Sequence, residues 1–82
     1  MIGRKVFYEE YEAYNGMSSN KVSEERKVCT TLIMSAINAW LAENPMFKVI
    51  NIQWRSNSDN SPFWEEALVF YEITEKTYYR MI

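Results

Sequence analysis

The stretch VINIQWRSNSDNSPFWEEALVFYEI, residues 49–73, decides the fold, because it holds two apolar-rich segments and the polar turn between them. SDNSP, residues 58–62, has the composition of a turn. The flanking segments 46–57 and 63–73 are rich in β-branched and aromatic residues, which favour strands. The stretch therefore predicts an antiparallel hairpin.

The two predicted strands differ in how their apolar residues are arranged. Strand 46–57 alternates between apolar and polar side chains, as a strand with one buried face does. One face is predicted to carry Ile50, Ile52 and Trp54. The other face is predicted to carry Asn51, Gln53 and Arg55. Strand 63–73 is apolar on both faces, which carry Ala67, Val69, Tyr71 and Ile73, and Leu68 and Phe70. A strand of this kind needs a cover on each side.

SEERKVCTTLIMSAINAWLAEN, residues 23–44, predicts an amphipathic helix. Ser23 is a suitable N-cap, and Glu24 and Glu25 then lie where the helix dipole favours negative charge. Pro45 ends the helix, because the residue before a proline is driven out of the helical region. An apolar stripe at helical spacing is formed by Cys29, Ile33, Ala36, Ile37, Trp40 and Leu41.

The remaining segments complete a β-α-β-β order. RKVFYEEYEAY, residues 4–14, predicts a strand, and residues 15–21 a loop. A right-handed crossover through the helix would put the first two strands parallel in one sheet. We therefore expect a single α+β domain, residues 1–82, built as a two-layer sandwich of one helix on a small three-stranded mixed sheet. Residues 74–82 are a strand extension, a helical turn or a docking tail.

One helix covers only one face of such a sheet. The other face is expected to expose Leu68 and Phe70, with Phe7 or Phe47 beside them, and exposed apolar patches mark interfaces. These four residues form the predicted interface of a homo-oligomer, packed face to face or edge to edge. The alternative is that residues 74–82 fold back and cover the patch.

Composition restricts the classes of partner. A net charge of −2 and a pI of about 5.1 disfavour nucleic acid, because phosphate binding needs clustered Lys and Arg. No stretch approaches the roughly 20 apolar residues of a membrane span, so no membrane partner is expected. A single cysteine, Cys29, and the lack of a signal-peptide pattern predict a reducing cytoplasm, that of a bacterial host.

The residues that carry most enzyme chemistry are scarce. The chain has no histidine, so a Ser or Cys nucleophile lacks its usual base, and zinc lacks its usual ligands. Two distant glycines, Gly3 and Gly16, make no phosphate-binding loop. Glu9–Glu10 and Glu65–Glu66 are adjacent on strands and should point to opposite faces. We therefore expect no enzyme, no catalytic residue, no metal and no cofactor.

Aromatic and basic residues form the remaining constellation. Rings that stack on a base and guanidinium groups that pair with phosphate are suited to a flat anionic ligand. The predicted ligand-binding residues are Trp54, Arg55, Trp64, Tyr78, Tyr79 and Arg80. Tyr, Trp and Arg are equally typical of protein interfaces, so oligomer contacts are the competing interpretation.

Four segments, KVFYEEYEAY, AINAWLAEN, VINIQWR and ALVFYEI, resemble the small sporulation-associated proteins of spore-forming Firmicutes and their phage-borne relatives. The resemblance implies no catalytic residues and no established mechanism. The longer first loop and the tail TEKTYYRMI depart from the family pattern.

Three functions of different class follow. The first is a phage or mobile-element protein that sequesters a small anionic, nucleotide-derived ligand at an oligomer interface and so inhibits host defence. This step rests on analogy with small phage inhibitors. The second is a protein–protein inhibitor or adaptor that acts through the exposed aromatic sheet face. The third is a sporulation-associated role.

Overall fold

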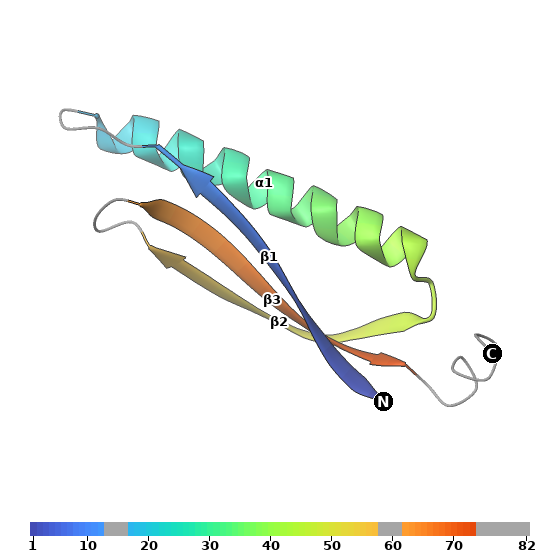
Figure 1. Cartoon of the computed structure of the whole chain (residues 1–82). Helices are drawn as coiled ribbons and strands as arrows, with labels where there is room; N and C mark the ends of the chain where they lie inside the picture. The colour runs from blue at the N-terminus through green and yellow to red at the C-terminus, as the bar shows by residue number, and fades with distance from the viewer. Residues whose placement is uncertain (13–16, 58–61, 74–82) are drawn as a thin grey trace.

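The computed structural model describes residues 1–12, 17–57 and 62–73. Within these ranges the elements follow in the order β1 (Ile2–Tyr11), α1 (Ser19–Glu43), β2 (Phe47–Asn57) and β3 (Phe63–Ile73) (Figure 1). The predicted β-α-β-β order and the α+β class are confirmed, and the bounds of β3 are those expected from the sequence. Residues 13–16, 58–61 and 74–82, and the predictions that fall on them, lie outside the described residues.

The sheet is antiparallel throughout, with the strand order β1-β3-β2. The predicted hairpin of β2 and β3 is confirmed, whereas the predicted mixed sheet is wrong, because every pair of hydrogen-bonded strands is antiparallel. β1 and β2 do run in the same direction, but β3 lies between them and pairs with both. The strand that is apolar on both faces therefore takes the central position, where burial is greatest.

The helix begins earlier than the sequence indicates. Its N-cap is Ser18, whose Oγ accepts a hydrogen bond from the Lys21 backbone N–H at 3.2 Å. The prediction of Ser23 as the N-cap is wrong, and residues 19–21, expected in a loop, are helical. Glu24 and Glu25 consequently lie in the second turn of the helix and not in the first. Both form ion pairs with Lys21 there. Ser18 is an equally good cap and adds a full turn to the helix.

α1 lies on one face of the sheet, over β1 and β3 (Figure 1). The centre of the core joins Ile33 and Ile37 of α1 to Ala67 and Val69 of β3. Ala67 is small enough to let the helix approach the central strand closely. The predicted apolar stripe of the helix is thus the surface that contacts the sheet, except for Ala36, which is exposed.

A β-bulge at Ile50 sets which side chains of β2 face the helix. Val49 pairs with Tyr71 and Asn51 with Phe70, so Ile50 is an extra residue in the ladder. The prediction that Ile50 shares a face with Ile52 and Trp54 is therefore wrong, because the extra residue reverses the alternation. Because of the bulge, the odd-numbered residues Phe47 and Val49 face the same side of the sheet as the even-numbered residues Ile52 and Trp54. Ile50 itself is exposed.

An aromatic cluster closes the end of the core next to the α1 C-terminus. The Trp40 ring lies 5.6 Å from Phe7, 5.3 Å from Phe47 and 5.0 Å from Tyr71, measured between centroids. Phe7 and Phe47 therefore belong to the helix-covered side, and the prediction that either lies beside Leu68 and Phe70 is wrong. 

Gly3 of β1 makes room for the ring of Tyr71, which belongs to this cluster. A Cβ atom at Gly3 would lie 2.6 Å from Tyr71 Cζ. The ring is held in this position by Phe47, whose centroid lies 4.4 Å away in a stacked arrangement. The close approach explains why the most crowded position of β1 carries no side chain.

Candidate functional site

The face of the sheet that α1 does not cover is the first candidate site, and it is called the open face here. The strand registers place on it alternate residues of each strand. These residues are Ile2, Arg4, Val6, Tyr8 and Glu10 of β1, Trp64, Glu66, Leu68, Phe70 and Glu72 of β3, and Lys48, Asn51, Gln53, Arg55 and Asn57 of β2.

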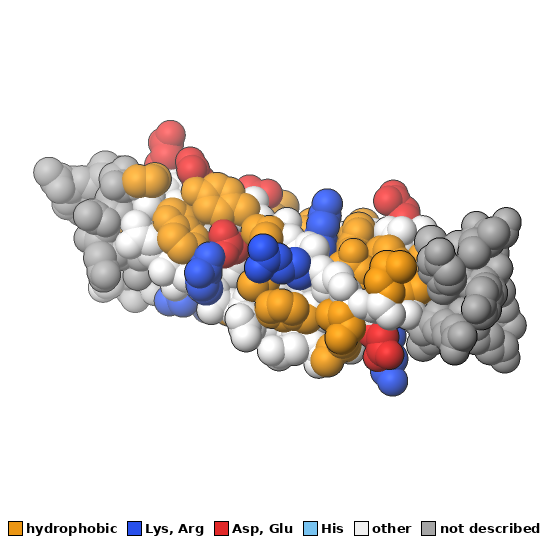
Figure 2. Space-filling model, turned by 60° about the horizontal axis from the view of Figure 1, so that its bottom comes forward, with side chains coloured by type: hydrophobic (Ala, Val, Ile, Leu, Met, Phe, Trp, Pro, Cys, Tyr) orange, Lys and Arg blue, Asp and Glu red, His pale blue; other side chains and the backbone are white. Residues whose placement is uncertain are grey.

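The apolar side chains of the open face are concentrated on β1 and β3. Ile2, Val6 and Tyr8 are 72%, 50% and 45% exposed. Leu68 and Phe70 of the central strand are half-buried by their neighbours alone. Figure 2 shows the molecule with the bottom of the Figure 1 view turned forward. Hydrophobic side chains form several separate groups on this surface, with Lys and Arg side chains between them. The open face is therefore an apolar surface with a scattered set of charges.

Three of the charged side chains of the open face, Arg55, Glu66 and Glu10, are hydrogen-bonded within it. Arg55 donates hydrogen bonds from Nε and Nη2 to Glu66 Oε1 at 3.1 and 2.9 Å. Tyr8 donates from its hydroxyl to Glu10 Oε1 at 2.6 Å, and this bond raises the pKa of Tyr8 to about 12. Pairing of this kind lowers the cost of burying the charged groups against a partner.

The predicted ligand-binding residues are brought together only in part. Trp54 pairs with Ala67 on the helix side of β2, so it points away from Arg55. Arg55 and Trp64 do share the open face on neighbouring strands, and the Trp64 ring lies 5.9 Å from that of Tyr8. Tyr78, Tyr79 and Arg80 lie outside the described residues.

Of the four predicted interface residues, Leu68 and Phe70 lie on the open face, and Phe7 and Phe47 do not. The analysis of the sequence missed Val6 and Tyr8, which extend the apolar surface onto β1. The sequence does carry a signal for them. Val6 and Tyr8 are two residues apart on a predicted strand, so they lie on the same face, opposite to that of Phe7.

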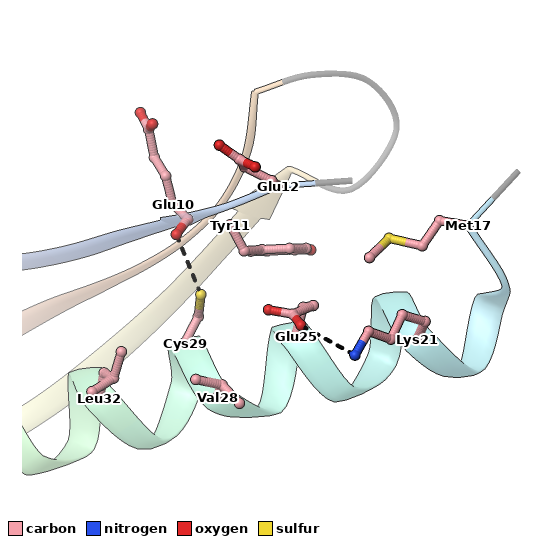
Figure 3. Close-up of a pocket in the computed structure, with 9 residues that line it drawn as sticks. All are labelled: Glu10, Tyr11, Glu12, Met17, Lys21, Glu25, Val28, Cys29 and Leu32. Atoms are coloured by element: carbon pink, nitrogen blue, oxygen red, sulfur yellow. Dashed lines mark hydrogen bonds and ion pairs between the residues drawn. The ribbon is translucent and has the colours of Figure 1, made fainter. Parts of the chain in front are cut away.

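The second candidate site is a cleft of about 480 Å³ between the end of β1 and the first half of α1. Figure 3 shows the side chains of Glu10 and Glu12 pointing away from the helix, while Glu25 extends from the helix on the other side of the cleft. Lys21 is a neighbouring cation and pairs with Glu25 at 3.8 Å. Lys21 is the only Lys or Arg among the described residues that line the cleft, and it is already paired, so the cleft is a poor site for an anionic ligand.

Neither nucleophile nor metal chemistry is supported at the cleft. Cys29 is buried, and its thiol donates to the Glu10 backbone carbonyl at an Sγ–O distance of 3.6 Å. Burial, reinforced by nearby carboxylates, raises the pKa of Cys29, which disfavours the reactive thiolate. Among residues 1–12, 17–57 and 62–73, no three Cys, Asp or Glu side chains form a group that could hold a metal ion.

The adjacent carboxylates behave as predicted for strand residues. Glu65 lies on the helix side, where Arg26 contacts it, and Glu66 lies on the open face with Arg55. The two carboxylates therefore cannot act together on one substrate. In the part of the chain that the structure describes, no helix is long and apolar enough to span a bilayer.

Comparison with known proteins adds no assignment: no family model, no curated protein and no solved structure matches the chain significantly. The resemblance to sporulation-associated proteins stays a prediction.

Proposed function

We propose that this chain is a non-catalytic binding protein whose open face docks on an apolar patch of another protein, as an inhibitor or adaptor. The observation that carries the proposal is the side of the central strand that no described element covers. Leu68 and Phe70 lie there beside Val6 and Tyr8, on a sheet whose other side is packed by α1. Exposed apolar patches of this extent on a small domain mark protein interfaces.

The chemistry of the open face favours a folded protein as its partner. Acidic and basic side chains occur on it in similar number, and Arg55 is already held by Glu66. A polyanion would need unpaired, clustered cations. An apolar centre with self-paired charges is instead complementary to a protein surface of mixed composition, with Trp64 and Tyr8 as candidate anchors.

Site-specific photocrosslinking in the native host tests the proposal. A benzoyl-phenylalanine at Leu68 should crosslink to a defined protein, whereas the same probe at Thr31, on the exposed side of α1, should not. The identified protein is then purified and its binding measured by calorimetry. Leu68→Asp should weaken the Kd by at least roughly tenfold, and Thr31→Asp should leave it unchanged. Equal crosslinking from both positions, or equal affinity of both variants, would rule out the open face as the docking surface.

Sequestration of a small anionic ligand at an oligomer interface is the second candidate function. It is favoured by one observation, that Arg55 and Trp64 lie on the same face of adjacent strands. A ring could stack on Trp64 while its phosphate displaces Glu66 from the guanidinium. Native mass spectrometry of protein from cells with active nucleotide signalling tests this function. A stoichiometric extra mass that disappears in Arg55→Ala supports it, and an unliganded wild-type protein counts against it.

A further inference from the structure

Within residues 1–12, 17–57 and 62–73, no strand pairs with the outer side of β1. Met1 and Ile73 exchange two backbone hydrogen bonds, of 2.9 and 3.3 Å, and so form a hydrogen-bonded pair at the start of the ladder. Because such pairs alternate in antiparallel sheets, the N–H and C=O groups of Arg4, Val6 and Tyr8 point away from β3. The Glu10 carbonyl has the same orientation, since it accepts from the Cys29 thiol.

β1 is the more regular of the two sheet edges. Its register with β3 runs unbroken from Ile2 to Tyr11, whereas β2 is interrupted by the bulge at Ile50. Bulges protect an edge from adding a further strand, and long regular edges are templates for strand pairing. An added strand is therefore expected at β1 and not at β2.

The sequence of this edge is complementary to itself when it is reversed. Residues 4–10 read RKVFYEE, with two cations at one end, two carboxylates at the other and an aromatic residue in the middle. We propose that β1 pairs antiparallel with β1 of a second copy of this chain, with Phe7 opposite Phe7 across a two-fold axis. The facing pairs are then Arg4 with Glu10, Lys5 with Glu9, and Val6 with Tyr8.

This register satisfies the backbone as well as the charges. Arg4, Val6, Tyr8 and Glu10 all have outward backbone groups, so each faces a residue with which it can exchange hydrogen bonds. A register centred on Val6 would place Arg4 opposite Tyr8 and leave the carboxylates without cations. Opposite charges that face each other across strands stabilise the pairing, and like charges oppose it.

The helix supplies a second, independent observation at the same edge. Val28 and Leu32 lie one turn apart on α1 and are 54% and 49% exposed. Both line the cleft beside Glu10, on the flank of the helix next to β1 (Figure 3). A strand added to β1 extends the sheet under this flank, and the helix above that strand covers the two side chains. The cleft is then part of the seam between the two copies.

The pairing goes beyond the proposed function and does not depend on it. It joins two three-stranded sheets into one continuous sheet and merges their open faces into a surface of twice the area. A docking partner would then be held across two copies of the chain. The edge pairing needs neither that partner nor a ligand, so purified protein alone tests it.

Sedimentation equilibrium of the full chain measures the dimer directly. Arg4→Glu and Glu10→Arg should each raise the dimer Kd by roughly tenfold or more, because each places like charges opposite one another in two symmetry-related pairs. The combined variant R4E/E10R restores opposite charges in both pairs and should recover the wild-type Kd. Lys48→Glu, which makes the same charge change on β2, is the matched control and should have no effect.

Val6→Pro tests the backbone contact separately. The Val6 N–H points outward and is not used by β3, so a proline there should leave the circular dichroism of the monomer unchanged and abolish the dimer. A wild-type chain that stays monomeric at millimolar concentration overturns the proposal. A dimer that survives Val6→Pro and both single charge reversals overturns it as well. A dimer that is dissociated by Leu68→Asp alone would place the contact on the open face instead.

Discussion

Arg26 of α1 donates from Nε to Glu65 Oε1 of β3 at 2.6 Å, and this contact holds the only described carboxylate that is fully buried. Glu65 is 3% exposed, whereas the Arg26 side chain is 52% exposed and reaches down from the helix surface. The bond therefore ties the first half of α1 to the central strand.

Arg26→Ala should lower the free energy of unfolding by about 1–3 kcal/mol, because it leaves the buried Glu65 carboxylate without its cation. Urea denaturation measures the change. Adding Glu65→Gln to this variant should recover part of the loss, since a neutral amide is less costly to bury. Lys21→Ala, which removes only exposed ion pairs, should cost less than about 0.5 kcal/mol. Equal effects of Arg26→Ala and Lys21→Ala would show that the buried contact contributes nothing.

Deletion of Ile50 should leave the fold intact. The bulge residue is exposed, and without it Val49 and Asn51 become consecutive partners of Tyr71 and Phe70 in a regular ladder. We expect a free energy of unfolding within about 1 kcal/mol of the wild-type value. Deletion of Gln53 in the same strand should cost more than about 2 kcal/mol, because it moves side chains of the helix face to the opposite side. Similar losses in both deletions would mean that the bulge is required for folding.

The sequence predicts the bounds and faces of β3 correctly but not the bulge at Ile50, and the reason is physical. The bounds of β3 and its two apolar faces follow from composition and alternation, which are local properties. The strand order depends on which strand is most buried, and that is a property of the whole sheet. The bulge leaves no local signal, because Ile50 continues the apolar alternation of Ile52 and Trp54. Its absence from the prediction displaced Phe47 to the incorrect face.

The candidate site was predictable where it depends on a single strand. Leu68 and Phe70 were identified from the apolar pattern of β3 alone. The pairing of Arg55 with Glu66 requires the register of two strands, and the Tyr8–Trp64 contact requires β1 to neighbour β3. Both relations depend on how the strands pair, which the pattern of a single strand does not show.

Glu10→Gln should lower the pKa of Tyr8 from about 12 toward its ordinary value of 10.0, because the carboxylate that accepts the hydroxyl hydrogen bond is removed. NMR of tyrosine labelled at Cζ follows the titration. Since the folded-state pKa lies above the unfolded one, this bond stabilises the fold below pH 10.0, and the contribution is lost as the pH rises toward 12. Glu12→Gln, which also removes one carboxylate from this end of the chain, should leave the Tyr8 titration unchanged. A Tyr8 pKa that does not respond to Glu10→Gln would exclude the hydrogen bond in solution.

Tyr11→Phe should raise the free energy of unfolding by about 1 kcal/mol, because the Tyr11 hydroxyl is buried without a hydrogen-bond partner among residues 1–12, 17–57 and 62–73. Phenylalanine keeps the stacked contact with Phe63, whose ring centroid lies 5.6 Å away. Burial also raises the pKa of Tyr11, so the wild-type chain should lose stability as the pH rises above 10.0, and the variant should lose less.

Chemical denaturation at neutral and alkaline pH measures both effects of Tyr11→Phe. Tyr8→Phe is the matched control: it removes an exposed hydroxyl that does have a partner, so it should give no gain. A loss of stability in Tyr11→Phe would mean that a bound water or ligand satisfies the hydroxyl in solution. Because Tyr11 borders the cleft beside Glu10, that outcome would direct the search for a bound molecule to this end of the sheet.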